Sequence, residues 1–599
     1  MAGLNCYSRR PMRTLFRLAA TCSLFVSAAT GQTDPRALLL SGYYEPGVVD
    51  NRTFFNPVVG WDLFWYAGFT GTRTVIGNIE GGNIWFGHKV FVRDPSATTG
   101  FTTYVNPAAG SLNELDYHAT TVGHVLAGSG YVTDGTIAGD TYSGLGMASG
   151  ASVIVAVEFS ATDPGSFSTT TESVITPYKA FFQGVGLGAG VARPDVINSS
   201  WGGGDPTATS TEALAIDGLA RQNPSVALVV SAGNGGSGAA VSFPGSCYNS
   251  IAVGSLGGSS YLQPSDFTSS GMVDFFIPGA NGGTTLTGVR AAVDIAAPGE
   301  DFFLAAYLGA SGTIGGAPSL AGLIHEPLPT NLYWTNMSGT SYSSPIVAGG
   351  ISLLKDAAKA IMPGNLNALD TRVIKSVLMA GATKTLGWNN GQNAMNVTTQ
   401  ALDLNTGAGA LNLAGAVEVY LGATRDVAGN GGGWIASAGW DSATIHLGNT
   451  LEYVFSAAFT QEMALTVALN WFSVREFSDT TLTGSDLAFS NLDLQVWSIN
   501  GQGQFTAMVG ESMTAYNNTE FLRFDSLAAG QYGLRVLFNG MVFDTTNAVT
   551  DESYGLAWSA VAIPEPGAAL LLSGGLLIGL RRRGGGGNRK KGQTLCVYA

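Results

Sequence analysis

One run of residues, 336–349, constrains the fold of this chain more than any other. It reads Asn-Met-Ser-Gly-Thr-Ser-Tyr-Ser-Ser-Pro-Ile-Val-Ala-Gly, and further aliphatic residues continue to Leu354. Pro345 suits the first turn of a helix, where a missing N–H is tolerated. Because the residues that follow are apolar on almost every side, we expect a buried helix with Ser341 at its N-terminus. Free N–H groups and the positive end of the helix dipole can stabilise an oxyanion there.

Length and charge narrow the classes of protein. A chain of 599 residues is expected to form two or three domains. Apolar residues make up 45% and charged residues 12%, which favours a globular chain over a disordered one. The ends, 1–31 and 564–599, hold ten of the 28 basic residues and one of the 42 acidic residues. The acidic part between them argues against nucleic acid as a partner and suits a soluble exported protein.

The string around Ser341, Gly-Thr-Ser-x-Ser-x-Pro-x-Val-Ala-Gly, closely resembles the nucleophile motif of the subtilisin-like serine peptidases. The resemblance covers about 62–422 and implies an α/β fold, with a three-layer parallel sheet and helices on both faces. It also implies a serine endopeptidase that acts on polypeptides. For one short motif the alternative is a buried helix that happens to begin with Ser and Thr caps.

A second motif supplies an acid. The apolar run 74–79 is typical of a buried strand, and it ends on Glu80. In the family the matching position is an aspartate that orients the catalytic histidine, so the resemblance gives Glu80 this role. Its carboxylate lies one methylene further out, and the histidine can be held only if the backbone or helix shifts accordingly. The alternative is that Glu80 is a structural carboxylate.

The histidine comes from 116–128, which resembles the family's His-Gly-Thr-x-Val-Ala-Gly helix, with Ala119 replacing the first glycine and Gly123 the alanine. Two histidines compete for the role of general base. His118 falls on the apolar helical stripe that should face the core, whereas His124 points nearly opposite. We therefore assign the base to His118 and expect His124 to be solvated or to support the site indirectly. We interpret His88 as structural.

Two glycine-rich strand ends complete the expected site. The first resembles the family's wall of the pocket for the residue before the scissile bond; its residues are Ser200, Trp201, Gly202 and Gly203. The second, Ala232-Gly233-Asn234, resembles the oxyanion motif, in which Asn234 aims its amide at the developing oxyanion opposite the N–H of Ser341. Glycines in these positions let a substrate strand approach the backbone closely. A glycine-rich loop and a turn-forming asparagine are the alternatives.

Past the peptidase-like region, residues 430–562 show alternating, aromatic and β-branched runs separated by turn residues. This texture predicts an all-β sandwich. It resembles the jelly-roll domains that follow the catalytic domain in some secreted subtilases. We expect this domain to pack against the catalytic domain, although ligand binding is an alternative.

Both ends of the chain carry export features. Residues 1–31 combine four arginines with an apolar run, which is typical of a signal peptide cleaved by signal peptidase, and 32–61 form a short N-terminal extension. Residues 563–599 combine Pro-Glu-Pro, a short apolar run and a basic tail. That pattern resembles a sorting signal cut by an exosortase-type enzyme, and an ordinary tail anchor is the alternative. We expect an exported protein, extracellular or at the cell surface, with transient or permanent membrane contact through this segment.

The acid, His and Ser motifs follow one another in the subtilisin order. The sequence therefore predicts a secreted serine endopeptidase that uses Ser341, His118, Glu80 and Asn234. The alternative is a catalytically inactive surface binding or adhesion protein on the same fold. No cofactor is identified. A structural calcium ion is conceivable by family resemblance, but no ligand spacing defines a site.

Overall fold

The computed structural model describes residues 56–563 except for internal gaps. The gaps are residues 92–100, 105–114, 131–143, 158–159, 164–165, 169, 281, 308–322, 325–332 and 428–429. The predicted signal peptide, most of the N-terminal extension and almost all of the predicted sorting signal lie outside the described residues. Within the described part, no helix has both the length and the apolar character needed to cross a bilayer.

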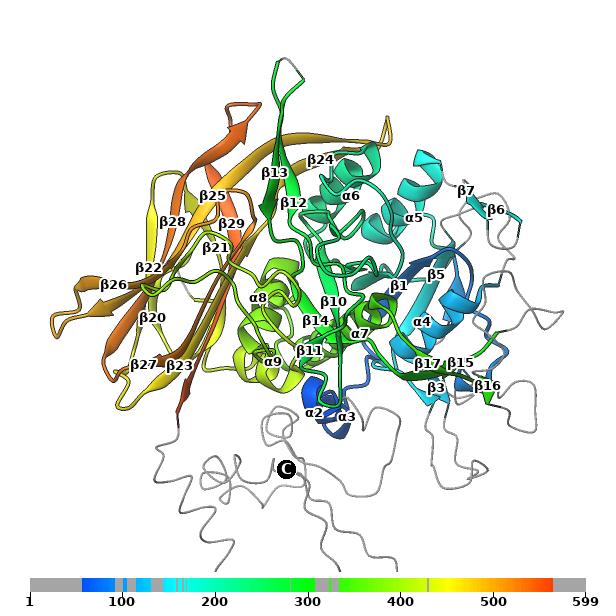
Figure 1. Ribbon diagram of the computed structural model, residues 1–599, viewed down its shortest axis with the longest axis horizontal. Helices are drawn as coiled ribbons and strands as arrows, with labels where there is room; N and C mark the ends of the chain where they lie inside the picture. Colours follow the sequence, from blue (N-terminus) through cyan, green and yellow to red (C-terminus); the bar gives the residue numbers. More distant parts are fainter. Residues whose placement is uncertain are drawn as a thin grey trace, which may run out of the picture. The chain divides into compact units, whose positions relative to one another are not determined.

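An eight-stranded sheet organises the first part of the chain, in the order β11-β10-β9-β8-β1-β5-β2 with β14 beside β10 (Figure 1). All of its pairings are parallel except that of β11 with β10. Along the sheet, the strands are β11 (Gln263–Pro264), β10 (Ile251–Gly257), β9 (Ala227–Ser231), β8 (Val196–Ser199), β1 (Val75–Glu80), β5 (Ser152–Val157) and β2 (Phe101–Thr103). The eighth strand, β14 (Ile295–Pro298), pairs with β10.

Helices cover both faces of this sheet, because successive strand residues point to opposite sides. Val153 and Val155 of β5 belong to one core, whereas Ile154 between them belongs to another. The first core also receives α4 (Tyr117–Ala127), α7 (Thr340–Ile361), α8 (Thr371–Gly381) and α9 (Leu413–Tyr420). The second receives α5 (Thr171–Gln183) and α6 (Thr211–Gln222). The predicted three-layer α/β architecture is confirmed.

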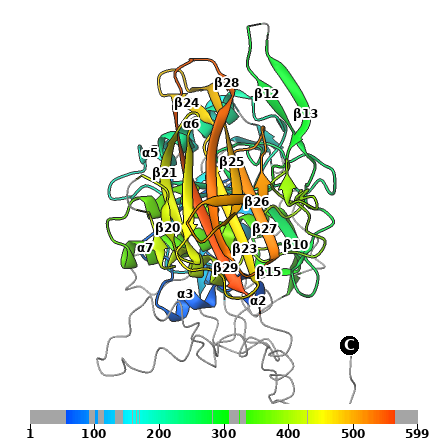
Figure 2. The same cartoon turned by 90° about the vertical axis from the view of Figure 1, so that its left-hand side faces the viewer.

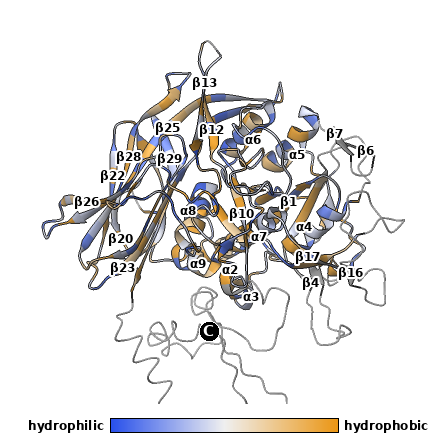
Figure 3. Ribbon diagram, viewed as in Figure 1, coloured by the Kyte–Doolittle hydropathy of each residue, from blue (hydrophilic) through white to orange (hydrophobic). Residues whose placement is uncertain are grey.

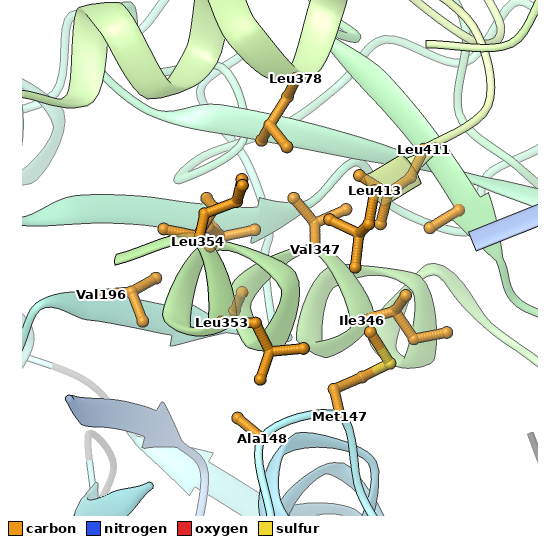
Figure 4. Close-up of a cluster of buried hydrophobic side chains, with 14 of the residues drawn as sticks. Met147, Ala148, Val196, Ile346, Val347, Leu353, Leu354, Leu378, Leu411 and Leu413 are labelled. Atoms are coloured by element: carbon orange, nitrogen blue, oxygen red, sulfur yellow. The ribbon is translucent and has the colours of Figure 1, made fainter. Parts of the chain in front are cut away.

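Helix α7 is the buried helix that the sequence predicts. Its buried residues run without a break from Thr340 to Ala358. Hydrophobic residues follow the central strands and the helices against them (Figure 3). Around α7, the neighbours shown in Figure 4 are Met147, Ala148, Val196, Leu378, Leu411 and Leu413. A helix that is buried on every side has no face to offer to water, so its surroundings fix its position.

The C-terminal part is built from two further β-sheets, as the texture of 430–562 predicts (Figure 2). The seven-stranded sheet comprises β18 (Val397–Thr398), β26 (Phe505–Ser512), β25 (Thr483–Ile499), β28 (Gln531–Asp544), β22 (Thr450–Phe455), β20 (Gly433–Ile435) and β24 (Val474–Ser478). The five-stranded sheet comprises β19 (Thr424–Arg425), β21 (Ala438–His446), β29 (Asp551–Ala562), β23 (Met463–Trp471) and β27 (Thr519–Leu527). We call these two sheets the β-sandwich.

The β-sandwich and the peptidase-like region share hydrophobic cores. The sandwich has a core of its own, which includes Trp471 and Trp558. However, Trp440 and Phe521 belong to the core that surrounds α7, and Phe489 belongs to the core under α5 and α6. The two regions lie in one compact unit. Apolar surface is thus removed from water jointly by both regions.

The region 256–335 contains two small β-structures besides strands of the main sheet. One is a hairpin of β12 (Val273–Ile277) and β13 (Thr284–Arg290), and another is a small sheet of β15 (Phe302–Ala305), β17 (Tyr333–Met337) and β16 (Leu323–Ile324). Phe275 in the hairpin packs on Phe489 of the sandwich, with ring centroids 4.9 Å apart. This hairpin therefore packs against the β-sandwich.

The remaining elements are short. They comprise α2 (Asn56–Val59), α3 (Asp62–Tyr66), two 3₁₀ turns (Lys89–Phe91 and Asn367–Leu369), and the strand pairs β3 (Ser129–Gly130) with β4 (Gly144–Leu145) and β6 (Ser160–Asp163) with β7 (Ser166–Ser168).

The packing of α7 predicts different outcomes for two adjacent glycines. A Cβ on Gly349 would lie 2.3 Å from Cβ of Met147, whereas one on Gly350 would lie 3.0 Å from the flexible end of Leu413. We expect Gly349→Ala to lower the free energy of unfolding by about 1–3 kcal/mol, as overpacked cores do. Gly350→Ala is the matched control and should be close to neutral, because the helix gains from alanine. Urea unfolding of both variants checks this, and equal midpoints would contradict it.

Candidate active site

Ser341 lies in the first turn of α7, at the end of the helix that the strands surround. Gly339 is the N-cap residue and offers no side chain to cap the helix. The Ser341 side chain is nearly buried, and its Oγ donates a hydrogen bond to the carbonyl oxygen of Ser200 at 3.1 Å. As a residue of the first turn, Ser341 keeps a backbone N–H that has no partner within the helix.

Glu80 and His118 meet, as the sequence predicts. Glu80 is the last residue of β1 and is 1% exposed. Its Oε2 lies 3.1 Å from Nδ1 of His118, and its Oε1 accepts a hydrogen bond from the Ser200 N–H at 3.0 Å. The longer glutamate side chain therefore spans from β1 to the histidine and is held by the strand end beside it.

The position of His118 follows from the start of α4. Asp116 caps this helix by accepting a hydrogen bond from the Ala119 N–H at 2.8 Å. Burial disfavours the charged imidazole, but the hydrogen bond and charge of Glu80, together with the charge of Asp116, outweigh it and raise the pKa of His118. The ring of Tyr342 lies beside that of His118, with centroids 6.3 Å apart.

Asn234 is oriented by Thr340, the residue directly before Ser341. Its Oδ1 accepts hydrogen bonds from both the N–H and the Oγ1 hydroxyl of Thr340, each at 2.9 Å. The Gly233 N–H in turn donates to Oγ1 of Thr340 at 3.2 Å. Because Oδ1 is the acceptor in this network, the amide nitrogen Nδ2 remains as a donor.

The two predicted oxyanion donors border the same space. A Cβ placed on Gly339 would lie 3.5 Å from Nδ2 of Asn234 and 3.7 Å from the backbone nitrogen of Ser341. Gly339 has no Cβ, so this space is open. An oxygen between these two donors could accept a hydrogen bond from each.

A cavity of about 280 Å³ opens beside Ser341. Four of the residues predicted to bind substrate line it: Ser200, Trp201, Gly202 and Gly233. Gly203 and Ala232 lie outside the lining; Ala232 is 1% exposed and donates its N–H to the strand β10. The other residues that line it are Ser231, Asn234, Gly235, Ala239, Ala240, Ser242, Ser269, Thr340 and Ser341. None of the lining residues is charged.

The other two candidate histidines are buried. His124 is 3% exposed, and its Nδ1 accepts a hydrogen bond from the Ala305 N–H at 3.0 Å. The expectation that His124 is solvated was wrong, because the inserted strand β15 covers that face of α4. His88 is 0% exposed and accepts from the Val90 N–H, in agreement with a structural role.

Metal binding stays an expectation. Among the described residues, no group of three or more His, Cys, Asp or Glu side chains is arranged to hold an ion. The possible structural calcium site therefore receives no candidate ligands.

Several residues of the site were missed in the sequence. Thr340 orients Asn234, and its place directly before Ser341 could have indicated this. Ser242, Ala239 and Ser269 line the cavity from segments with no motif of their own. Ser200 was assigned to substrate binding, but its backbone N–H and carbonyl also connect Glu80 with Ser341.

Comparison with solved structures finds peptidases. The prenylagaramide maturation protease PagA is 20% identical, covers 61% of this chain and 98% of its own, and superposes with a TM-score of 0.39. The patellamide maturation protease PatA is 20% identical, covers 58% of this chain and 98% of its own, and has a TM-score of 0.38. No match was found among curated proteins.

Comparison with a family model identifies the family of this chain. The model of the subtilase family of peptidases, Peptidase_S8, matches residues 73–409, which is more than half of the chain. This match spans Glu80, His118, Asn234 and Ser341, the residues that the structure brings to one edge of the sheet. The chain belongs to the subtilase family of serine peptidases.

Proposed function

We propose that this chain is a serine endopeptidase that cleaves polypeptides with Ser341 as nucleophile, His118 as base and Glu80 as the orienting acid. One observation carries the proposal. One carboxylate oxygen of Glu80 is hydrogen-bonded to Nδ1 of His118, and the other accepts a hydrogen bond from the Ser200 N–H. The carbonyl oxygen of Ser200 in turn accepts a hydrogen bond from the Ser341 hydroxyl. This arrangement supports a Glu/His/Ser variant of the subtilisin triad.

Proton transfer in this arrangement runs through Nε2 of His118. With Nδ1 bonded to Glu80, the neutral imidazole presents Nε2 as its basic nitrogen. The Ser341 hydroxyl turns from the Ser200 carbonyl to Nε2, and catalytic hydrogen bonds often tighten in this way only once substrate is bound. Oγ then attacks the peptide carbonyl while Nε2 takes the proton, and Glu80 stabilises the imidazolium.

The oxyanion of the tetrahedral intermediate forms at the space beside Gly339. Nδ2 of Asn234 and the N–H of Ser341 donate to it, and the positive end of the α7 dipole adds to the stabilisation. As the intermediate collapses, His118 returns its proton to the leaving amine. Water, activated by the same histidine, then hydrolyses the acyl-enzyme and frees Ser341.

The cavity beside Ser341 supports a preference for uncharged side chains at the residue before the scissile bond. The described residues that line it are uncharged, so a charged side chain would enter without a counter-ion. Gly202 lets its segment approach that of Phe243 closely, because a Cβ there would lie 2.9 Å from the carbonyl oxygen of Phe243.

Export is part of the proposal. The arginine-rich apolar segment in 1–31 and the Pro-Glu-Pro, apolar and basic segment in 563–599 support secretion, with sorting at the cell surface by an exosortase-type enzyme.

Covalent labelling tests the proposed activity first. We expect a fluorophosphonate to label the wild-type protein and not Ser341→Ala, because only an activated serine reacts readily. Casein hydrolysis should be lost in the same variant. Gly350→Ala, which lies on the same helix away from the site, serves as the control. A wild-type protein that neither reacts nor hydrolyses casein would favour the inactive binding scaffold.

Removing the amide of Asn234 should slow the chemical step. We expect Asn234→Ala to lower kcat by about 10²–10³, the loss known for the corresponding donor of subtilisin, a member of this family, with a small change in KM. Thr340→Val should give a smaller loss, because it removes one of the two hydrogen bonds that orient the Asn234 amide and leaves the one from the backbone N–H. Steady-state kinetics on a peptide substrate measures both. A normal kcat in Asn234→Ala would show that this amide does not contact the oxyanion.

The Glu80–His118 pair sets the pH dependence. Because the base must be neutral and the pKa of His118 is raised above 6.5, kcat/KM should fall as pH drops through a value above 6.5. Glu80→Gln removes the charge, so this acid limb should move to lower pH and the plateau should fall. The profile of kcat/KM against pH provides the measurement. An unchanged acid limb in Glu80→Gln would mean that another group orients the histidine.

A further inference from the structure

The β-sandwich extends one buried arginine into the peptidase-like region. Arg475 lies on β24 and is 2% exposed. Its Nη2 donates to Asp486 of the sandwich at 3.0 Å. Its Nη1 donates to Asp217 of α6 at 2.9 Å and to the carbonyl oxygen of Ala208 at 2.7 Å. One guanidinium therefore joins the sandwich to a helix and a loop of the peptidase-like region.

The loop that Arg475 holds continues the first wall of the cavity. This wall includes Ser200, Trp201 and Gly202, and the chain reaches Ala208 six residues after Gly202. Ala208 has a φ of +54°, in the left-handed region that L-residues rarely adopt. A strained residue persists only where its surroundings enforce the conformation, and the hydrogen bond from Arg475 is one such contact.

Asp217, the residue of α6 that pairs with Arg475, supports the second wall of the cavity, which includes Ser242. Both oxygens of Asp217 accept backbone hydrogen bonds, from the Tyr248 N–H at 3.0 Å and the Asn249 N–H at 2.8 Å. These residues end a short segment that begins with Ser242, which lines the cavity. The guanidinium of Arg290 lies over the ring of Tyr248 at 3.9 Å, and that of Arg475 lies 4.7 Å from the same ring.

The two walls are also bonded to each other. The Gly203 N–H donates to the carbonyl of Phe243 at 2.8 Å, and the Phe243 N–H donates to the carbonyl of Gly204 at 3.1 Å. The Ser246 hydroxyl donates to the carbonyl of Asp205 at 2.8 Å. A displacement of the Ala208 loop or of the segment that Asp217 holds should therefore move both walls of the cavity.

We propose that Arg475 is a positioning residue for the specificity cavity, which makes the β-sandwich part of the substrate-binding machinery of the peptidase. The inference rests on the proposed function, since the cavity selects substrates only if Ser341 cleaves them. A buried ion pair adds little net stability compared with apolar residues, but it demands fixed geometry from its partners. Here those partners are the segments behind the two walls.

The test compares full-length variants on peptides that differ only in the residue before the scissile bond, with Ala, Leu, Lys or Glu there. Arg475→Met should reduce the preference for Leu over Lys, measured as the ratio of kcat/KM values, by about tenfold, mainly through KM. Arg475→Lys keeps the positive charge but loses the planar guanidinium that reaches several partners at once, so the ratio of kcat/KM values for Leu and Lys should be intermediate. Arg535→Met is the matched control, because Arg535 pairs with Glu452 within the sandwich.

Fluorophosphonate titration counts the active sites in every sample, so partial unfolding does not enter the ratio. Arg475→Met/Asp217→Asn removes both buried charges and serves if the single variant fails to fold. A wild-type ratio in Arg475→Met, Arg475→Lys and the double variant would overturn the positioning role, as would an equal change in Arg535→Met. An inactive wild-type protein would instead refute the proposed function, and the positioning role with it.

Discussion

The site depends on the burial of α7. A helix that is buried on every side depends on the elements that surround it, and here these are the parallel sheet, α4, α8 and α9. Its N-terminus is thereby fixed at the edge where the parallel strands end. Glu80 ends β1, Ser200 follows β8 and Asn234 follows β9 closely, so all three arrive at Ser341 without a dedicated loop.

Ser200 is the point at which this edge becomes a connected site. Its N–H holds one oxygen of Glu80, and its carbonyl accepts the hydroxyl of Ser341. The second contact fixes the direction of the Ser341 hydroxyl. The first anchors the side chain that is one methylene longer than the aspartate expected in this family. Ser200 lies just past the end of β8, so its backbone N–H and C=O, which belong to successive peptide groups, are both available for these contacts.

The β-sandwich and the peptidase-like region form one hydrophobic unit. Trp440 and Phe521 complete the core around α7, and Phe489 completes the core beneath α5 and α6. Removal of the sandwich would expose both cores to water, which is unfavourable in proportion to the apolar area. The buried contacts of Arg475 lie within this joint packing. The positioning role proposed for Arg475 would couple substrate selection to the packing of the sandwich.

The sequence alone determined the elements of the fold and the identity of the principal side chains. An apolar run of strand length predicted β1, glycine-rich strand ends predicted β8 and β9, and the pattern after Ser341 predicted α7, because these signals are local in the chain. The choice of His118 over His124 also followed from helical spacing. Glu80 was predicted as the acid from its match to the family's aspartate at the end of a strand.

Only the tertiary structure decided how these residues contact one another. The bond between Arg475 and Ala208 joins residues 267 positions apart, and that between Ser341 and Ser200 spans 141 positions. Likewise, His124 is buried because strand β15, far along the chain, covers it. Such contacts depend on the path of the whole backbone, and no local pattern of hydrophobicity or spacing encodes that path. Periodicity thus fixed what each segment forms, while packing fixed which groups share a hydrogen bond.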